Sequence, residues 1–257
     1  MVIMDMFPLW AVYVGTVVLV LVAAEIGFRI GIWLQRRDPA SGEIRMTSTM
    51  VGGMLALMAF LMAFSIGIVI NQHGGRKEMV VTEANAVGTA YLRAGFLSEP
   101  NLTSTRDLLR EYVELRLAVA EDLGLFDSGL TRSEEIHSEL WSIVEGNVSQ
   151  GQESAIMALF VDSINEVIDV HSLRLTAFEL RLPRLLGIVL YIATLLSFLL
   201  VGVSDSADGK RDPLAMLLFA LAFVAVLMIV VDLDRPQQGL LTVSQSALSD
   251  LLRQMTP

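Results

Sequence analysis

The chain has 257 residues, of which 54% are hydrophobic, and a mean hydropathy of +0.60, which is more apolar than a soluble domain and predicts an integral membrane protein. Because the chain has no cysteine, disulfides, thiolate metal sites and cysteine nucleophiles are excluded. The formal charge of −10 argues against a nucleic-acid partner, since phosphate binding needs a basic patch and the basic residues here lie in short groups beside apolar runs.

The first apolar run, from about Leu9 to Leu34, is long enough to span a bilayer. It contains Glu25 and Arg29, which are four residues apart and therefore share one helix face. We expect them to form an ion pair near the membrane edge that Arg36 and Arg37 mark. A role facing a pore or another subunit is the alternative.

A second apolar run, Val51 to Ile70, contains no charged residue and predicts a membrane helix, followed by a break at Gly74 and Gly75. Small residues recur on one face, where they permit close approach of a neighbouring helix: Gly52, Ala56, Ala59, Ala63 and Gly67. A bulky stripe follows at i, i+4 and i+8, with two polar residues beyond it: Phe60, Phe64, Ile68, Asn71 and His73. Contact with lipid or protein is the simpler interpretation of the bulky stripe, and an apolar pore neck with Asn71 and His73 at its mouth is the alternative.

Between Arg76 and about Leu182 the chain is polar, and its apolar residues recur at helical spacing. The first predicted helix ends near Pro100, and the second runs from about Ser104 to Gly124. A capping-box pattern at 131–134 predicts the start of the third, and the fourth begins near Glu153. Short breaks between such helices imply antiparallel neighbours, hence a bundle.

Two further apolar runs, about Arg184 to Val203 and Pro213 to Val231, are joined by the polar loop SDSADGKRD and predict a membrane hairpin. The second of these ends at Asp232 and Asp234, although carboxylates at a helix C-terminus are unfavourable to the helix dipole. We therefore expect Arg235 or a basic residue of the helical domain to compensate them.

The expected fold is an all-α membrane protein with four transmembrane helices and a helical-bundle soluble domain inserted between the second and third. Four parts are predicted: transmembrane helices 1 and 2 in 1–72, the soluble domain in 73–183, transmembrane helices 3 and 4 in 184–235, and an amphipathic segment in 236–257. The even number of spans puts both termini and the domain on one side. Basic residues in the two short loops favour loops inside.

No catalytic constellation and no cofactor site is recognisable. His73, His137 and His171 stand alone in the sequence, so we expect neither an enzyme nor a metal site. Glu83 and Asn85 follow the second span, where they are either polar groups that find hydrogen-bond partners inside the bundle or part of the junction between membrane and domain. That junction would also include the residues at the end of the fourth span, Asp232, Asp234 and Arg235.

Several stretches together resemble the bestrophin-like domain family of bacterial membrane proteins. They are EANAVGTAYLRA (Glu83–Ala94), LLREYVELRL (Leu108–Leu117), NEVIDVHSLRL (Asn165–Leu175), DLDRPQQG (Asp232–Gly239) and Ser244-Gln245. The resemblance covers nearly the whole chain. It implies a more distant similarity to true bestrophins, which are pentameric anion channels with four spans per subunit and a pore lined by the second. It also implies a cytoplasmic bundle, opposite to the side that the loop charges favour.

The leading hypothesis is therefore an oligomeric bestrophin-like ion channel, a cyclic ring in the bacterial inner membrane whose second span surrounds a path for a small inorganic ion. The alternative is a non-conducting membrane scaffold or sensor whose helical domain binds a protein partner. A transporter is disfavoured because no span is broken at its midplane and no inverted repeat is visible.

Overall fold

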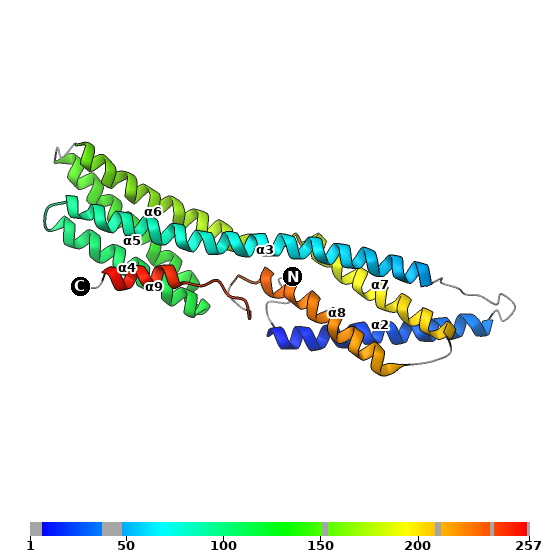
Figure 1. Cartoon of the computed structure of the whole chain (residues 1–257). Coiled ribbons are helices and arrows are strands. Elements are labelled where there is room, and N and C mark those ends of the chain that lie inside the picture. The colour runs from blue at the N-terminus through cyan, green and yellow to red at the C-terminus, as the bar shows by residue number, and fades with distance from the viewer. Residues whose placement is uncertain (1–6, 38–47, 151–153, 209–211, 237–238, 256–257) are drawn as a thin grey trace. The chain divides into compact units, whose positions relative to one another are not determined.

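The structure is a computed structural model that describes residues 7–37, 48–150, 154–208, 212–236 and 239–255. Within these ranges it is helical and has no strand. The α-helices are α2 (Leu9–Arg37), α3 (Ser48–Arg93), α4 (Asn101–Glu121), α5 (Phe126–Ser149), α6 (Ala155–Glu179), α7 (Arg184–Asp208), α8 (Pro213–Asp234) and α9 (Ser246–Met255). Two short 3₁₀ turns, η2 (Ala94–Phe96) and η3 (Leu123–Leu125), follow α3 and α4. Figure 1 traces these elements along the chain.

The chain divides into two compact units. One, which we call the span unit, comprises Met1–Asn71 and Arg181–Leu241. The other, the bundle unit, comprises Gln72–Leu180 and Thr242–Pro257. The predicted amphipathic C-terminal segment is thus shared, and its residues from Thr242 onward belong to the bundle unit.

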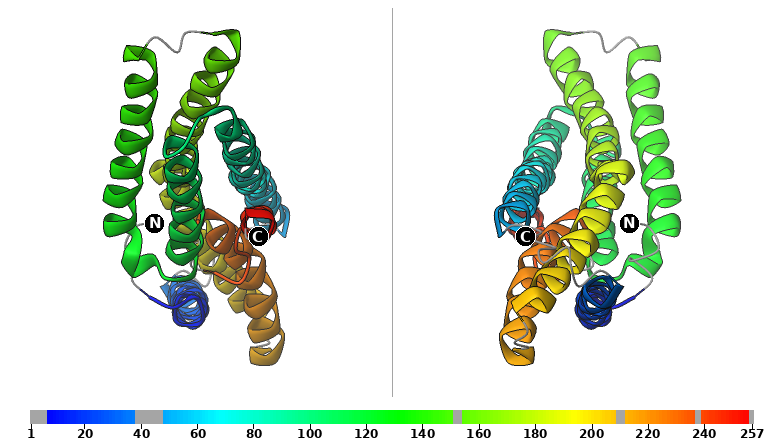
Figure 2. Two further views of the ribbon diagram at one scale, coloured as in Figure 1. Left: turned by 90° about the vertical axis from the view of Figure 1, so that its left-hand side faces the viewer. Right: turned by 90° about the vertical axis from the view of Figure 1, so that its right-hand side faces the viewer.

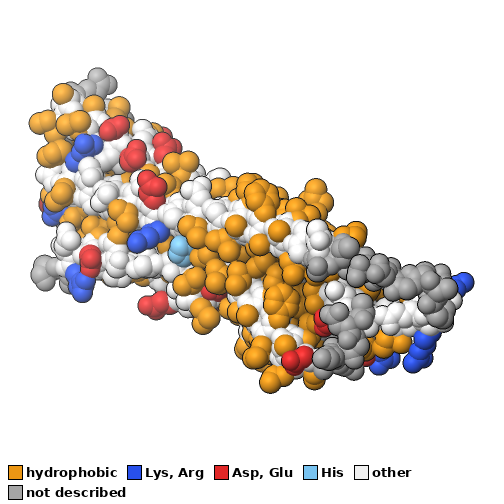
Figure 3. All heavy atoms as spheres, turned by 45° about the vertical axis from the view of Figure 1, so that its right-hand side comes forward, with side chains coloured by type: hydrophobic (Ala, Val, Ile, Leu, Met, Phe, Trp, Pro, Cys, Tyr) orange, Lys and Arg blue, Asp and Glu red, His pale blue; other side chains and the backbone are white. Residues whose placement is uncertain are grey.

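Four helical stretches are long and apolar enough to cross a membrane: Leu9–Arg37, Thr49–Phe96, Ala155–Ser206 and Pro213–Asp234. The second and third have 48 and 52 residues, whereas about 20 residues cross a bilayer, so each also extends well beyond the hydrocarbon. Large apolar side chains of the span unit are exposed on α2, α3, α7 and α8. Figure 3 shows such side chains gathered over this part of the chain on the face that it presents. An exposed apolar surface of this kind is what a lipid environment accommodates.

Helices α2 and α7 lie in very close contact. A Cβ atom added at Gly27 would lie 2.0 Å from the carbonyl oxygen of Leu199, and one added at Gly202 would lie 2.0 Å from that of Ala24. Gly31, four residues after Gly27, likewise faces α7. Because these positions have no side chain, the two backbones can touch. Small residues commonly permit such close approach between membrane helices.

Helix α3 passes through Gly74 and Gly75 without interruption, so the predicted break there is wrong. Each glycine costs about 1 kcal/mol relative to alanine in a helix interior, which weakens a helix but does not end it when residues on both sides are packed. Val69 before the pair and Val80 after it are both buried. The predicted polar loop after Val203 is also partly helical, because α7 continues to Asp208; its residues 209–211 lie outside the described part.

The bundle unit has one core to which α3, α4, α5, α6 and α9 all contribute. Its fully buried side chains include Val87, Leu109, Ile136, Phe160 and Leu248. Figure 2 shows α4, α5 and α6 in its two turned views. Helix α9 lies against α3 and α4, with the Tyr91 hydroxyl donating to the Met255 carbonyl at 3.2 Å.

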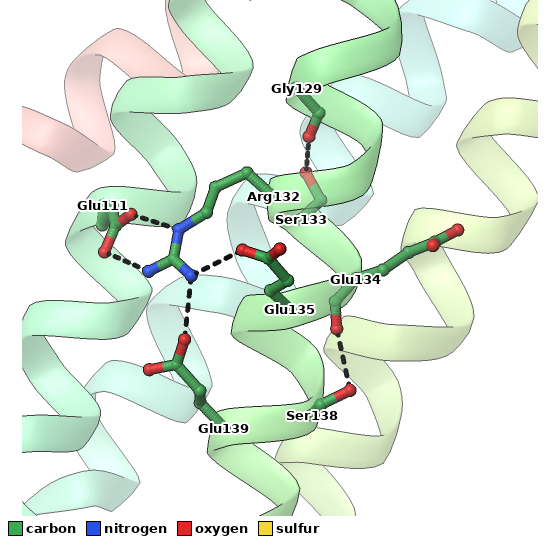
Figure 4. A network of polar contacts seen from close by, with 8 residues as sticks. All are labelled: Glu111, Gly129, Arg132, Ser133, Glu134, Glu135, Ser138 and Glu139. Carbon is green, nitrogen blue, oxygen red and sulfur yellow. Dashed lines mark hydrogen bonds and ion pairs between the residues drawn. The ribbon is translucent and has the colours of Figure 1, made fainter.

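Helix α5 begins at Phe126, before the predicted capping box at 131–134. Thr131 therefore lies inside the helix, where its hydroxyl donates to the Asp127 carbonyl at 3.1 Å instead of capping an N-terminus. The next residue, Arg132, reaches across to α4 and forms two hydrogen bonds with Glu111, at 2.7 and 3.1 Å (Figure 4). It also contacts Glu135 and Glu139 on its own helix, and Glu111 above all raises the pKa of Arg132 above its ordinary value.

The close contact of α2 and α7 yields a prediction. Gly27→Ala should destabilise the span unit by about 1–3 kcal/mol, because the new methyl group overlaps the Leu199 backbone and the helices must move apart. The thermal midpoint of the protein in detergent should fall accordingly. Gly15→Ala on the same helix is the control, since nothing lies within 4 Å of a Cβ there. Equal midpoints for the two variants would show that this contact does not hold the helices.

Candidate functional site

The first candidate site is the part of α3 that belongs to the span unit. One face of it packs into the core of its own chain through Met58, Met62, Ser65 and Val69. The bulky stripe lies on other faces: Phe60 is 67% exposed, Phe64 is 56% exposed, and Ile68 is half-buried. Neither phenylalanine is therefore needed for packing within one chain.

The small-residue stripe of α3 is also exposed, at Gly52, Ala56, Ala59, Ala63 and Gly67. A Cβ atom at Gly52 or Gly67 would meet nothing within 4 Å. This differs from α2, whose glycines touch α7. Within a single chain, α3 thus presents both predicted stripes, and the role of each stays a prediction.

The second candidate site lies inside the bundle unit around the carboxylate of Glu83, which has no exposed surface. The Tyr112 hydroxyl on α4 donates a hydrogen bond to Glu83 Oε1 at 2.6 Å. Arg116, one turn further along α4, places its Nε 3.3 Å from the same oxygen. Arg174 on α6 pairs with Glu83 Oε2 and also donates to Gln245 Oε1 at 2.8 Å. Three helices and the segment before α9 therefore meet at one carboxylate.

Two histidines complete this group, which we call the Glu83 cluster. The Nδ1 atom of His171 lies 2.9 Å from the Tyr112 hydroxyl oxygen. The rings of His137 and His171 are in edge-to-face contact, with centroids 4.8 Å apart, and the ring centroids of His137 and Tyr112 are 5.3 Å apart. The expectation that these histidines stand alone is thus wrong, because α5 and α6 bring together residues 34 positions apart in the sequence.

Burial dominates the electrostatics of the Glu83 cluster. It raises the pKa of Tyr112 to about 12, and lowers that of Arg174 to about 10. It also lowers the pKa of His137 to about 4 and that of His171 to about 3, and the nearby Arg116 charge acts in the same direction. The imidazoles are therefore neutral at pH 7. The cluster then carries two guanidinium charges against the Glu83 carboxylate.

The chemistry of the Glu83 cluster is that of a structural polar core. Within the described residues no group of three or more His, Asp or Glu side chains is placed to hold a metal ion. The charged groups are paired, as buried charges must be. Of the two interpretations of Glu83 and Asn85, satisfaction inside the bundle holds for Glu83, whereas Asn85 is exposed.

A third polar group closes the end of α8. Asp232 accepts hydrogen bonds from the backbone N–H groups of Leu240 and Leu241, at 2.9 and 3.1 Å. A Cβ atom at Gly239 would lie 1.9 Å from Asp232 Oδ1, so a side chain there would have to displace the Asp232 carboxylate. The two predicted carboxylates are thus compensated partly by backbone donors, a possibility that the charge argument did not include.

The neighbouring Asp234 follows the same rule. Its Oδ1 accepts from the Leu182 backbone N–H at 2.5 Å, and its Oδ2 lies 3.9 Å from Arg181 Nη1. Arg235 donates to the Phe7 carbonyl at 3.1 Å. The expected pair of Glu25 and Arg29 is also present, at 2.8 Å on the surface of α2.

Loss of the Glu83 charge should destabilise the bundle unit strongly. Glu83→Gln leaves Arg116 and Arg174 buried without a counter-charge, which typically costs about 3–5 kcal/mol. Chemical unfolding of the bundle unit, followed by fluorescence, measures the loss. Glu78→Gln is the matched control, because Glu78 is an exposed carboxylate on the same helix. A loss below about 1 kcal/mol for Glu83→Gln would mean that the cluster does not stabilise the bundle.

Comparison with known proteins is informative for the fold. A crystal structure of a bacterial bestrophin homologue from Klebsiella pneumoniae superposes with a TM-score of 0.63 at 14% identity, covering 92% of this chain and 96% of that one. A variant of that homologue gives a TM-score of 0.63 at 14% identity, covering 95% of this chain and 98% of that one. Another solved membrane protein superposes with a TM-score of 0.68 at 12% identity, covering 93% of this chain and 96% of that one. No curated protein matches the chain.

The sequence match is more specific than these structural likenesses. The family model of the bestrophin-like domain matches residues 22–248, a range that contains the exposed stripes of α3, the whole Glu83 cluster and the turn after α8. Together with the four helices that are able to cross a membrane, this match identifies the chain as an integral membrane protein of the bestrophin-like family.

Proposed function

We propose that this protein is a homo-oligomeric, bestrophin-type ion channel of the bacterial inner membrane, in which copies of α3 surround a path for a small inorganic ion. Membership of the bestrophin-like family supports the channel. Within the described residues the span unit of one chain has a packed apolar core, so we place the ion path on an axis shared by several copies.

The observation that carries the proposal is the exposed surface of α3. A membrane helix with a glycine and alanine stripe is suited to helix contact, because small residues permit the close approach that stabilises helix pairs. In α2 and α7 the close contacts are made within the chain, whereas the stripe of α3 is left exposed. We assign it to the α3 helices of neighbouring subunits.

The bulky stripe then faces the axis. Phe60, Phe64 and Ile68 would form an apolar neck that gates by loss of water, and Asn71 and His73 would lie at its mouth. In this arrangement Asn85, Asp232, Asp234 and Arg235 would keep their predicted place at the junction between membrane and bundle, whereas Glu83 is paired inside the bundle. Such a neck would not distinguish anions from cations, because it presents no ring of charged side chains to the ion.

Assembly is the first test. Mass measurement of the detergent-solubilised protein should give a defined multiple of the 28.1 kDa chain. Protein that is only monomeric at every concentration would contradict the proposal, since a single chain does not enclose an axis.

Ion flux is the second test. Purified protein in liposomes should pass chloride or a monovalent cation, while empty liposomes stay tight. An oligomer that assembles but passes no ions would favour the alternative, a scaffold or sensor whose bundle unit binds a protein partner. The carboxylates around Arg132 on the surface of the bundle would then be a place to look for that partner.

The two stripes of α3 should respond differently to substitution. Ala59→Leu should prevent assembly, because it puts a large side chain where two backbones meet. Phe64→Ala should leave the oligomer intact and increase conductance, because it widens an apolar constriction. Single-channel recording and mass measurement on the same preparations separate the two effects.

The opposite pattern would overturn this assignment. If Ala59→Leu assembles normally and alters conductance, while Phe64→Ala conducts like the wild type, the stripes have been exchanged. If neither substitution matters in a protein that conducts, α3 does not line the pore.

A further inference from the structure

The bundle unit holds an unoccupied position for a proton at His171. The Tyr112 hydroxyl donates its single hydrogen to Glu83 Oε1, so its oxygen can only accept from His171 Nδ1. The hydrogen of the neutral imidazole is therefore on Nδ1, and Nε2 carries a bare lone pair. This Nε2 atom is buried and has no hydrogen-bond partner in the described part of the chain.

His137 is in a similar position. Its Nε2 atom is also buried without a partner, and its ring contacts both His171 and Tyr112. Two neutral imidazoles from α5 and α6 thus fill the space beside Tyr112 on α4. Neither the family match nor the proposed channel assigns them a role.

A proton added to either imidazole would meet an unfavourable set of charges. The charged or titratable groups that face the pair are Glu83 from α3, Tyr112 and Arg116 from α4, and Arg174 from α6, while the C-terminal segment contributes the neutral Gln245. Two guanidinium groups against one carboxylate already leave an excess positive charge in a buried site. Each imidazolium would add another within ring-contact distance, and the new N–H of His171 at Nε2 would have no acceptor among the described residues.

We propose that His137 and His171 form an acid-sensing latch of the bundle unit: the neutral pair keeps α5 and α6 packed on α4, and proton uptake by the pair opens that packing. The direction follows from linkage. Burial lowers the pKa of both histidines far below that of the unfolded chain, about 6.5, so the native bundle binds fewer protons than the open one. The stability that the neutral pair contributes is present above pH 6.5 and is lost as the pH falls toward 4.

The latch can be measured with one fluorophore. The chain has three tryptophans, and in a Trp10→Phe, Trp33→Phe background the remaining Trp141, packed on the bundle core from α5, reports on that unit alone. Urea unfolding of the full-length protein in detergent between pH 7.5 and 4.5 gives the number of protons taken up on opening from the slope of stability against pH.

Between pH 6 and 5 the wild type should take up about two more protons than the double variant His137→Gln, His171→Asn, and each single variant should lose about one of them. The asparagine retains an N–H donor near the position of Nδ1, so the bond to Tyr112 is kept while titration is removed. His73→Gln is the matched control, because it removes the remaining histidine of the chain and leaves the pair of His137 and His171 in place, so its slope should exceed that of the double variant.

A double variant with the slope of the wild type would overturn the latch, and so would an equal loss in His73→Gln. If the variants do not fold, hydrogen exchange of the wild type decides. After correction for the intrinsic pH dependence, protection of α5 and α6 should fall by at least about tenfold from pH 7 to pH 5, while that of α2 and α7 is retained. Unchanged protection of α5 and α6 would reject the proposal. None of these measurements involves conduction, so they stand apart from the tests of the channel.

Discussion

A carboxylate without access to water must be matched by the groups around it, and Glu83 imposes this requirement on the whole bundle unit. Its partners come from α4 and α6, and through Arg174 the contact extends to Gln245 just before α9. The apolar core would permit small shifts of these helices past one another, because apolar contacts have no direction. Hydrogen bonds and ion pairs to one carboxylate do not permit such shifts, because each requires a particular distance and angle. The cluster therefore specifies which faces of the helices meet.

The same rule explains the end of α8. Asp232 and Asp234 stand where the helix dipole disfavours them, and each is held by backbone N–H groups from chain segments that have left a helix or have not yet entered one. A carboxylate that accepts two backbone donors organises a turn much as a capping residue organises a helix end. Gly239 suits this position because a Cβ atom there would push against the Asp232 carboxylate that accepts these bonds.

How far the sequence predicts this structure depends on whether a feature is local. The apolar runs of the span unit are local, and α2, α3, α7 and α8 lie where hydropathy predicts helices. The break that the sequence predicts at Gly74 and Gly75 is absent, because a sequence pattern shows the cost of glycine but not the packing on either side that outweighs it. The Glu83 cluster is not local at all. His137 and His171 look isolated until α5 and α6 are paired, although most residues of the cluster already lay in the stretches on which the family resemblance rests.

Glycine and alanine stripes carry the same sequence signal in α2 and α3, yet the structure treats them differently. In α2, Gly27 and Gly31 pack directly against α7, and Gly202 of α7 packs in the same way against α2. In α3, the face used within the chain is instead formed by methionine, serine and valine, whose larger side chains reach the core without backbone contact. The small residues of α3 therefore contribute nothing to the fold of one chain, and in lipid alone they would pack no better than leucine. The proposed assembly would give their regular spacing a physical reason, because another helix would then lie against them. Assembly, rather than conduction, is therefore the part of the proposal that the sequence of α3 supports most directly.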